Sequence, residues 1–345
     1  MKAAVFRGLG NPLAIETVVD PELRDGEVLL KVAYCGICGS DLHATAEGVF
    51  VVPDGTVLGH EFSGEVMESA DAAWTKGDRL TSVPVNACVD EICQRLGACK
   101  NDLGILCPNN RITGLALDVP GAYAEYIKIG ARQALRLPNG VSYEEGALVE
   151  PLAVGLHAVR KAKLGVGARV LIIGAGPIGL SVAAFARLAG AREVVVSEMN
   201  ATRREKSMAM GATAVIDPAS ENTAEAFAKI AGCPPDVIFE CVGVRGLIQQ
   251  CIDLSRPRGL IVVVGVCMME DSVVPISAIL KELDIQFVLG YLSEDFDIVL
   301  DAIAKKTINA MPMVSDIVGF DELPAAFEAL RRPKGQIKVL IRPGV

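Results

Sequence analysis

The residue types best suited to chemistry stand in two short, glycine-framed runs near the start of the chain. The first run contains Cys38, Ser40 and His43, and the second contains His60 and Glu61. Thiolate, imidazole and carboxylate are the ligands that a catalytic zinc ion prefers when one coordination position must stay open. The chain has only three histidines, and two of them fall in these runs. The two runs therefore indicate a catalytic metal site.

A second motif, of the form GxGxxG, lies further along the chain. It comprises Gly174, Gly176, Pro177, Ile178 and Gly179. An apolar run precedes it, an alanine-rich segment follows it, and Glu198 comes nineteen residues after the last glycine. Such glycines let the backbone approach a pyrophosphate at a helix N-terminus, and an acidic residue after the next strand can bind the ribose hydroxyls. This context predicts a dinucleotide site.

The residues around this motif bear on which dinucleotide binds. Glu198 favours NAD over NADP, because its carboxylate would repel a 2′-phosphate. Arg203 and Arg204 follow closely enough to offer the opposite charge, although they also suit the first turn of the next helix. Cys241, Val242 and Gly243 stand at the end of the fourth expected strand, where the nicotinamide would emerge. The alternative is that these residues form only a turn.

Length and composition limit the class of protein. A chain of 345 residues exceeds what one hydrophobic core usually supports, so we expect two domains. The formal charge of −9 disfavours nucleic acid, which needs a basic face. The longest charge-free run, 170–186, is broken by glycines and a proline and does not predict a membrane span. The first residues lack the apolar core of a signal peptide, so we expect a cytoplasmic protein whose ten cysteines are thiols or metal ligands.

The pattern of apolar residues changes near residue 150. Before it come short β-like runs separated by Gly, Pro and Asp, which predict an irregular, mostly β domain. After it, apolar runs alternate with helical segments, as a doubly wound α/β domain with a parallel sheet requires. The expected strands of that sheet are 170–173, 194–196, 214–216, 237–239, 260–264 and 285–289. The last fifty residues predict two helices and a strand that fold back onto the first domain.

Four motifs occur in the order found in a known family. They are residues 35–41, the Gly59-His60-Glu61 triplet, residues 150–153 and the glycine motif. With them the chain resembles the zinc-dependent medium-chain alcohol dehydrogenases over essentially its whole length. It is most similar to the branch of sorbitol, 2,3-butanediol and threonine dehydrogenases, which carry Glu at the position of Glu150.

The resemblance implies a domain plan and an assembly. A GroES-like catalytic domain would cover 1–153, a Rossmann domain that binds NAD or NADP would cover 154–293, and residues 294–345 would return to the catalytic domain. The active site would lie between the two domains. Members of this family are commonly homodimers or homotetramers.

The resemblance also implies roles for individual residues. Cys38 and His60 would bind the catalytic zinc, and either Glu61 or Glu150 would supply the third protein ligand. Ser40 would contact the substrate oxygen and pass its proton toward the cofactor ribose. His43 is either an outer member of that proton relay or a surface histidine.

A second cluster of cysteines resembles the structural zinc lobe of the family. Cys99 and Cys107 keep the family spacing, whereas the run 89–98, which follows Cys88 and contains Cys93, departs from the pattern and is longer. Four thiolates suffice for a closed tetrahedral site. We therefore expect a structural zinc, with a lobe of metal-free thiols as the alternative.

These observations predict a zinc-dependent oxidoreductase. It would transfer a hydride between NAD or NADP and a secondary alcohol, vicinal diol or polyol, reversibly forming the ketone. A threonine- or primary-alcohol-type dehydrogenase on the same zinc is the first alternative. A cofactor-binding protein without turnover is the second, because a fold alone does not establish activity.

Overall fold

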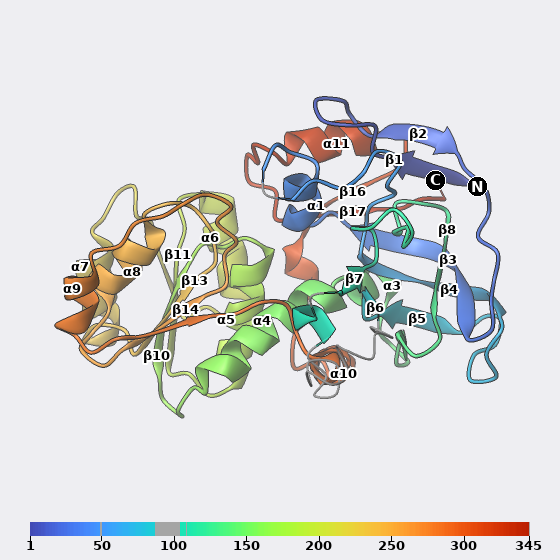
Figure 1. The fold of residues 1–345 in the computed structure, drawn as a ribbon. Helices are drawn as coiled ribbons and strands as arrows, with labels where there is room; N and C mark the ends of the chain where they lie inside the picture. The colour runs from blue at the N-terminus through green and yellow to red at the C-terminus, as the bar shows by residue number, and fades with distance from the viewer. Residues whose placement is uncertain (49, 87–103, 108, 345) are drawn as a thin grey trace. The chain divides into compact units, whose positions relative to one another are not determined.

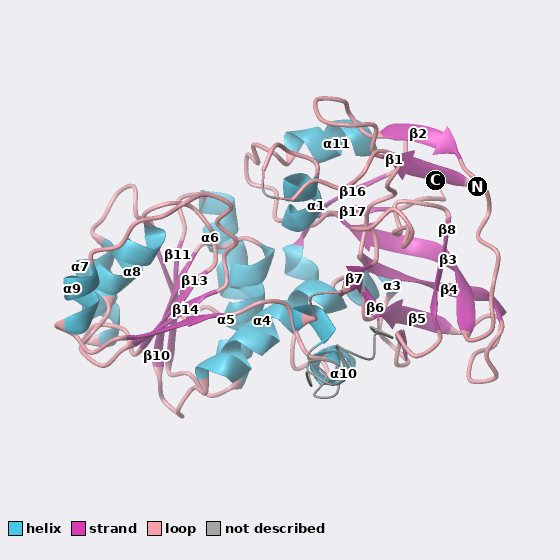
Figure 2. Cartoon of the chain, viewed as in Figure 1, coloured by secondary structure: helices cyan, strands magenta, loops and turns pink. Residues whose placement is uncertain are grey.

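The computed structural model describes residues 1–48, 50–86, 104–107 and 109–344. The chain forms two compact units. The first unit comprises Met1–Glu150, Leu292–Lys306 and Val314–Val345. The second unit comprises Pro151–Tyr291 and Thr307–Met313. Strands dominate the first unit, whereas strands and helices alternate in the second (Figure 2).

The first unit is built on a mostly antiparallel sheet whose main path runs β16-β17-β3-β4-β5-β9, with β8 also paired to β3. Its strands are β1 (Lys2–Val5), β2 (Ala14–Thr17), β3 (Glu27–Gly36), β4 (Glu61–Ser69), β5 (Arg79–Ser82), β6 (Val85–Asn86), β7 (Arg111–Ile112), β8 (Tyr126–Gly130), β9 (Ala134–Arg136), β16 (Val314–Val318) and β17 (Lys338–Ile341). Its helices are α1 (Gly39–Ala44), η1 (Gly104–Leu106), α3 (Tyr143–Ala147), α10 (Ser293–Ala304) and α11 (Leu323–Ala329).

Strand β3 shows why this sequence forms a half-buried sheet. Val28, Leu30 and Val32 alternate with more exposed neighbours and point into the core, as the two-residue period of a strand requires. An irregularity in the pairing with β4, between Val32 and Tyr34, changes that alternation. After it the end of β3 is buried on both sides. A bulge of this kind re-aims the side chains that follow it in the strand, and Cys38 comes two residues after the end of β3.

The second unit contains six parallel strands in the order β12-β11-β10-β13-β14-β15. This is the doubly wound sheet that the sequence predicts, so the fold class is confirmed. The strands are β10 (Arg169–Ile173), β11 (Glu193–Ser197), β12 (Ala214–Ile216), β13 (Val237–Glu240), β14 (Leu260–Val263) and β15 (Asp284–Phe287). The helices are α4 (Val149–Ala162), which begins in the first unit, α5 (Pro177–Leu188), α6 (Ala201–Ala209), α7 (Thr223–Ala231), α8 (Leu247–Leu254), α9 (Pro275–Ile279) and η2 (Met311–Met313).

Helices cover both faces of the parallel sheet (Figure 1). Phe227 of α7 and Ile252 of α8 pack with apolar strand residues such as Ile238 in one buried cluster. Helices α5 and α6 lie on the opposite face. Within the described residues, no helix has both the length and the apolar character to cross a membrane.

Several elements of the first unit escaped the sequence analysis. Helix α3 is only five residues long, too short to show a helical period. Strand β16 has little buried surface and therefore lacks an apolar alternation. Strand β8 begins at Tyr126, so Tyr123 lies in the segment that leads into β8.

Candidate active site

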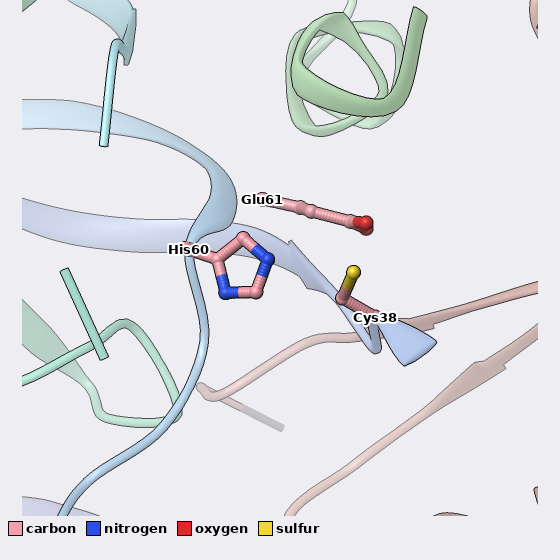
Figure 3. A group of neighbouring side chains, drawn as sticks. All are labelled: Cys38, His60 and Glu61. Atoms are coloured by element: carbon pink, nitrogen blue, oxygen red, sulfur yellow. The ribbon is translucent and has the colours of Figure 1, made fainter. Parts of the chain in front are cut away.

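Cys38, His60 and Glu61 come together at one end of the β3–β4 pair. Cys38 caps the N-terminus of α1 immediately after β3, and His60 immediately precedes Glu61, the first residue of β4. One ligand atom from each residue lies within 4.8 Å of the others, and in the described part of the chain this is the only such group of three or more. Figure 3 shows the Cys38 sulfur and the Glu61 carboxylate turned into the same space beside the His60 ring.

The hydrogen bonds around His60 set the direction of its ring. The Ser40 hydroxyl donates to Cys38 Sγ at 3.1 Å and lies 3.3 Å from His60 Nε2. On the other side of the ring, His60 Nδ1 faces Asp41 Oδ1 at 3.4 Å, and neither atom has another hydrogen-bond partner among the described residues. Nε2 therefore faces the thiol, and Nδ1 faces a buried carboxylate. This is the arrangement of a metal-binding histidine with a carboxylate behind it.

Burial and neighbouring charges together set the pKa values of this group. Burial opposes charge on His60, but the Asp41 carboxylate and the Cys38 thiolate outweigh it and raise the pKa of His60 well above its ordinary value. Burial raises the pKa of Asp41, and His60 more than compensates, so the pKa of Asp41 is lowered. Burial, followed by the charge of Glu61, raises the pKa of the Cys38 thiol. A divalent cation would neutralise this excess of negative groups, and the donor set of sulfur, imidazole and carboxylate fits zinc.

The sequence analysis missed Lys338, a fully buried partner of the group. Its ammonium lies 2.7 and 2.6 Å from the two Glu61 oxygens and donates to the Ile37 carbonyl at 2.9 Å. Burial lowers the pKa of Lys338, but Glu61 reverses that effect and the pKa is raised. Gly36 leaves room for the pair, because a Cβ there would lie 2.1 Å from Glu61 Oε2. Lys338 stands 277 residues from Glu61 with no local motif, so only the pairing of β17 with β3 reveals it.

The other predicted residues of the first unit stand outside the group. Glu150, in the first turn of α4, is buried, and its charge contributes to the raised pKa of Lys338. His43 is an exposed residue of α1. Of the four cysteines of the second cluster, Cys88, Cys93 and Cys99 lie outside the described residues, while Cys107 is buried.

The glycine motif forms the turn between β10 and α5. Gly176 caps α5 and Pro177 is its first residue, which leaves the N-terminal backbone amides of the helix open to an anion. A Cβ on Gly179 would lie 2.0 Å from the Gly174 carbonyl oxygen, so the helix and turn pack as closely as glycine permits. A Cβ on Gly176 would meet nothing within 4 Å. That open side is where a pyrophosphate would approach the backbone.

Glu198 lies beside this turn. Its carboxylate accepts from the Ala175 backbone amide at 2.8 Å and from the Asn200 amide at 2.8 Å. Arg204 donates to the Glu198 and Met199 carbonyls and pairs with Asp217 at 2.9 Å. Arg204 is therefore already engaged by other groups, whereas the Glu198 carboxylate is fixed at the turn.

The end of β13 packs against the same turn. A Cβ on Gly174 would lie 2.5 Å from Val242 Cγ2, and one on Gly179 would lie 3.6 Å from Cys241 Cβ. The buried Glu240 carboxylate accepts from the Val242 and Gly243 amides at 2.7 and 2.8 Å. The structure thus brings residues 241–243 beside the glycine turn, at the carboxyl ends of neighbouring strands.

A potential catalytic metal group in one unit and a dinucleotide turn in the other define a metal-dependent dehydrogenase. Comparison with known proteins agrees. Residues 24–139 match the model of the alcohol dehydrogenase GroES-like domain, and residues 177–305 match the model of the zinc-binding dehydrogenases.

Full-length relatives identify the family. The chain is 35% identical to sorbitol dehydrogenase of Gallus gallus, over 99% of this chain and 96% of the relative. It is 32% identical to (R,R)-butanediol dehydrogenase of Bacillus subtilis, over 99% and 100%. A putative zinc-binding dehydrogenase of Sinorhizobium meliloti, solved bound to NADP, superposes with a TM-score of 0.88 at 32% identity, covering 99% of each chain. The protein belongs to the zinc-dependent medium-chain alcohol dehydrogenases and is an oxidoreductase that uses zinc and a nicotinamide cofactor.

Proposed function

We propose that this enzyme reversibly oxidises a secondary alcohol of a vicinal diol or polyol to the ketone. The first unit would hold the catalytic zinc and the second the nicotinamide cofactor. The observation that carries the proposal is the convergence of Cys38, His60 and Glu61 within 4.8 Å of one another, in a chain that also has the dinucleotide turn. The similarity to sorbitol and butanediol dehydrogenases over nearly the full chain supports the substrate class.

The contacts suggest a division of roles. Cys38 Sγ and His60 Nε2 would hold the zinc, with a third ligand from Glu61, the nearer candidate, or Glu150. Zinc at this site supplies Lewis-acid polarisation of a substrate oxygen. The Ser40 hydroxyl, within hydrogen-bond distance of both Cys38 and His60, would contact that oxygen and accept its proton while passing its own proton toward the cofactor ribose. His43, exposed on α1, would act only as an outer member of the relay.

A panel of alcohols tests this function. Purified protein, NAD and a set of vicinal diols, polyols, L-threonine and primary alcohols would be mixed while reduced cofactor is followed by absorbance. We expect turnover with the diols or polyols and a loss of at least about 100-fold in Cys38→Ser, with cofactor binding retained, since even an outer partner of a ligand is worth 10–100-fold. Turnover with threonine or primary alcohols alone would favour the first alternative. Cofactor binding with no turnover on any substrate would favour a non-catalytic protein.

We further propose that NAD is preferred over NADP. The Glu198 carboxylate is fixed at the glycine turn, where it would meet a 2′-phosphate, and Arg204 is already paired with Asp217. Because a relative of 32% identity was solved bound to NADP, the two cofactors must be compared directly. The ratio of kcat/KM for the two cofactors measures the preference, and a ratio that favours NADP would point to Arg203 as a phosphate ligand.

A second, structural zinc would be bound by Cys88, Cys93, Cys99 and Cys107. The number of these cysteines and the family spacing of Cys99 and Cys107 support it, because four thiolates close a tetrahedral site. Metal analysis should then approach two zinc per chain, and Cys99→Ser should lose one zinc and stability while keeping the rate per folded enzyme. One zinc per chain in the unaltered protein would contradict this second site.

We also propose that the enzyme is a homo-oligomer paired through the edge of the parallel sheet. Strand β15 ends the sheet and, among the described strands, has only β14 as a neighbour. Phe287 at its end is 70% exposed, and Ile279 and Leu280, at the end of α9 before β15 begins, are 65% and 78% exposed. An open edge with large apolar residues favours pairing with a second copy about a two-fold axis.

A further inference from the structure

The carboxylate behind His60 is itself held by other groups. Asp41 lies in the first turn of α1 and is fully buried. Its Oδ2 accepts two hydrogen bonds, one from the Cys38 backbone amide at 3.1 Å and one from the Tyr123 hydroxyl at 2.7 Å. Its Oδ1 faces only His60 Nδ1, at 3.4 Å. The two donors on Oδ2 therefore fix the rotation of the carboxylate that places Oδ1 opposite the imidazole.

Tyr123 reaches this position from a distant part of the chain. Its ring is fully buried in the segment before β8 and meets Phe327 of α11 edge to face, with centroids 6.4 Å apart. On its other side the ring lies against Gly59, whose φ of +99° and missing side chain leave the space, since a Cβ would stand 2.4 Å from the ring. The Tyr123 amide also donates to the Leu58 carbonyl at 2.9 Å. Because the ring and the backbone of Tyr123 are both fixed, its hydroxyl is directed at Asp41 Oδ2.

We infer that Tyr123 is a positioning residue for the catalytic zinc, acting through Asp41 on His60. By holding Oδ2, its hydroxyl keeps Oδ1 on the Nδ1 side of the imidazole. That side then carries the proton, and Nε2 is left as the lone pair that faces Cys38. The inference rests on the proposed function, because it takes His60 as a zinc ligand. A tyrosine that merely satisfied a core hydrogen bond would have no influence on the metal.

The test is Tyr123→Phe, which removes the hydroxyl and keeps both ring contacts. The catalytic zinc is identified as the zinc that is lost in Cys38→Ser. This comparison distinguishes it from any structural zinc, which that variant would keep. We expect its affinity, measured by chelator competition, to fall by about 3- to 10-fold, less than the 10–100-fold of a direct partner of the ligand. In cobalt-substituted protein the visible bands of the site should shift. The control is Tyr126→Phe on β8, half-buried, which should change neither reading.

A double-mutant cycle with Asp41→Asn tests the route of the effect. If Tyr123 acts through Asp41, then Tyr123→Phe should cause no further loss of zinc affinity in the Asp41→Asn protein. Should Asp41→Asn fail to fold, the cobalt spectrum of Tyr123→Phe decides alone. The inference is overturned if Tyr123→Phe lowers stability but leaves the zinc affinity and the cobalt bands unchanged. It is also overturned if Tyr123→Phe lowers the zinc affinity equally in the unaltered protein and in the Asp41→Asn protein. Full zinc retention by Cys38→Ser would instead show that the proposed zinc site itself is wrong.

Discussion

At the residue scale, the Glu61 carboxylate is held by a buried cation and is also a candidate metal ligand. Lys338 contacts both of its oxygens, and the carboxylate lies in the group with Cys38 and His60 that could hold zinc. Both members of the ion pair are almost fully buried, at 1% and 2% exposure. In a buried pair each charge depends on the other, because neither has water to replace a lost partner. Lys338 thus permits a carboxylate beside the thiolate when no metal is bound.

We predict that Lys338→Met destabilises the zinc-free protein by about 3–5 kcal/mol, the usual cost of leaving one charge of a buried pair uncompensated. Glu61→Gln should do the same by leaving the ammonium alone. The double variant Lys338→Met/Glu61→Gln should recover most of the loss. Urea unfolding of the metal-free proteins measures all three, and a double variant as unstable as the sum of the single ones would show that the pair is not coupled.

At the scale of elements, two glycines of the turn between β10 and α5 have different roles. Gly179 is needed for packing, because its Cα faces the Gly174 carbonyl across a gap that no side chain fits. Gly176 faces open space and so is not required by the fold of the second unit. Its missing side chain is explained by the approach of a ligand to the helix N-terminus.

This difference predicts two distinct phenotypes. Gly176→Ala should weaken NAD binding by about 10-fold or more, equal to 1.4 kcal/mol, while unfolding shifts by no more than about 1 kcal/mol for an altered cap. Gly179→Ala should lower both the binding and the thermal stability, because the turn must move. Titration of NADH fluorescence and thermal unfolding measure the two effects. If Gly176→Ala bound NAD normally, the pyrophosphate could not approach from that side.

For the whole molecule, the apolar edge of the second unit bears on assembly. Phe287 and Leu280 are large apolar side chains that are 70% and 78% exposed, and exposed apolar patches are typical of interaction sites. Pairing two copies along β15 would satisfy the open strand edge and cover these side chains in one step.

We predict that Phe287→Lys converts the oligomer to a smaller species, because it places a charge where two copies would meet. Light scattering coupled to size-exclusion chromatography measures the mass. The matched control is Val166→Lys, at a 95% exposed apolar residue in the loop between α4 and β10, which should keep the native mass. An unaltered protein that is monomeric, or a Phe287→Lys protein of unchanged mass, would contradict pairing at this edge.

The sequence alone determined what depends on local order. The six strands and intervening helices of the second unit follow from apolar runs that alternate with amphipathic segments, and the structure has them within a few residues. The glycine turn and Glu198 were predicted because the residues typical of a dinucleotide site all lie in one continuous βαβ segment. Cys38 was proposed from one short motif, and His60 and Glu61 from another.

Only the tertiary structure decided which groups surround the candidate metal ligands. Lys338 comes from β17 at the far end of the chain, and the sheet order β17-β3-β4 places it on Glu61. Tyr123 is brought to Asp41 by the packing of its ring between Gly59 and Phe327. Neither residue has a sequence signature, because a buried lysine and a buried tyrosine acquire their roles from partners far away in the sequence. The ligand motifs are local, whereas the charges and hydrogen bonds that hold them in place are products of strand pairing and core packing.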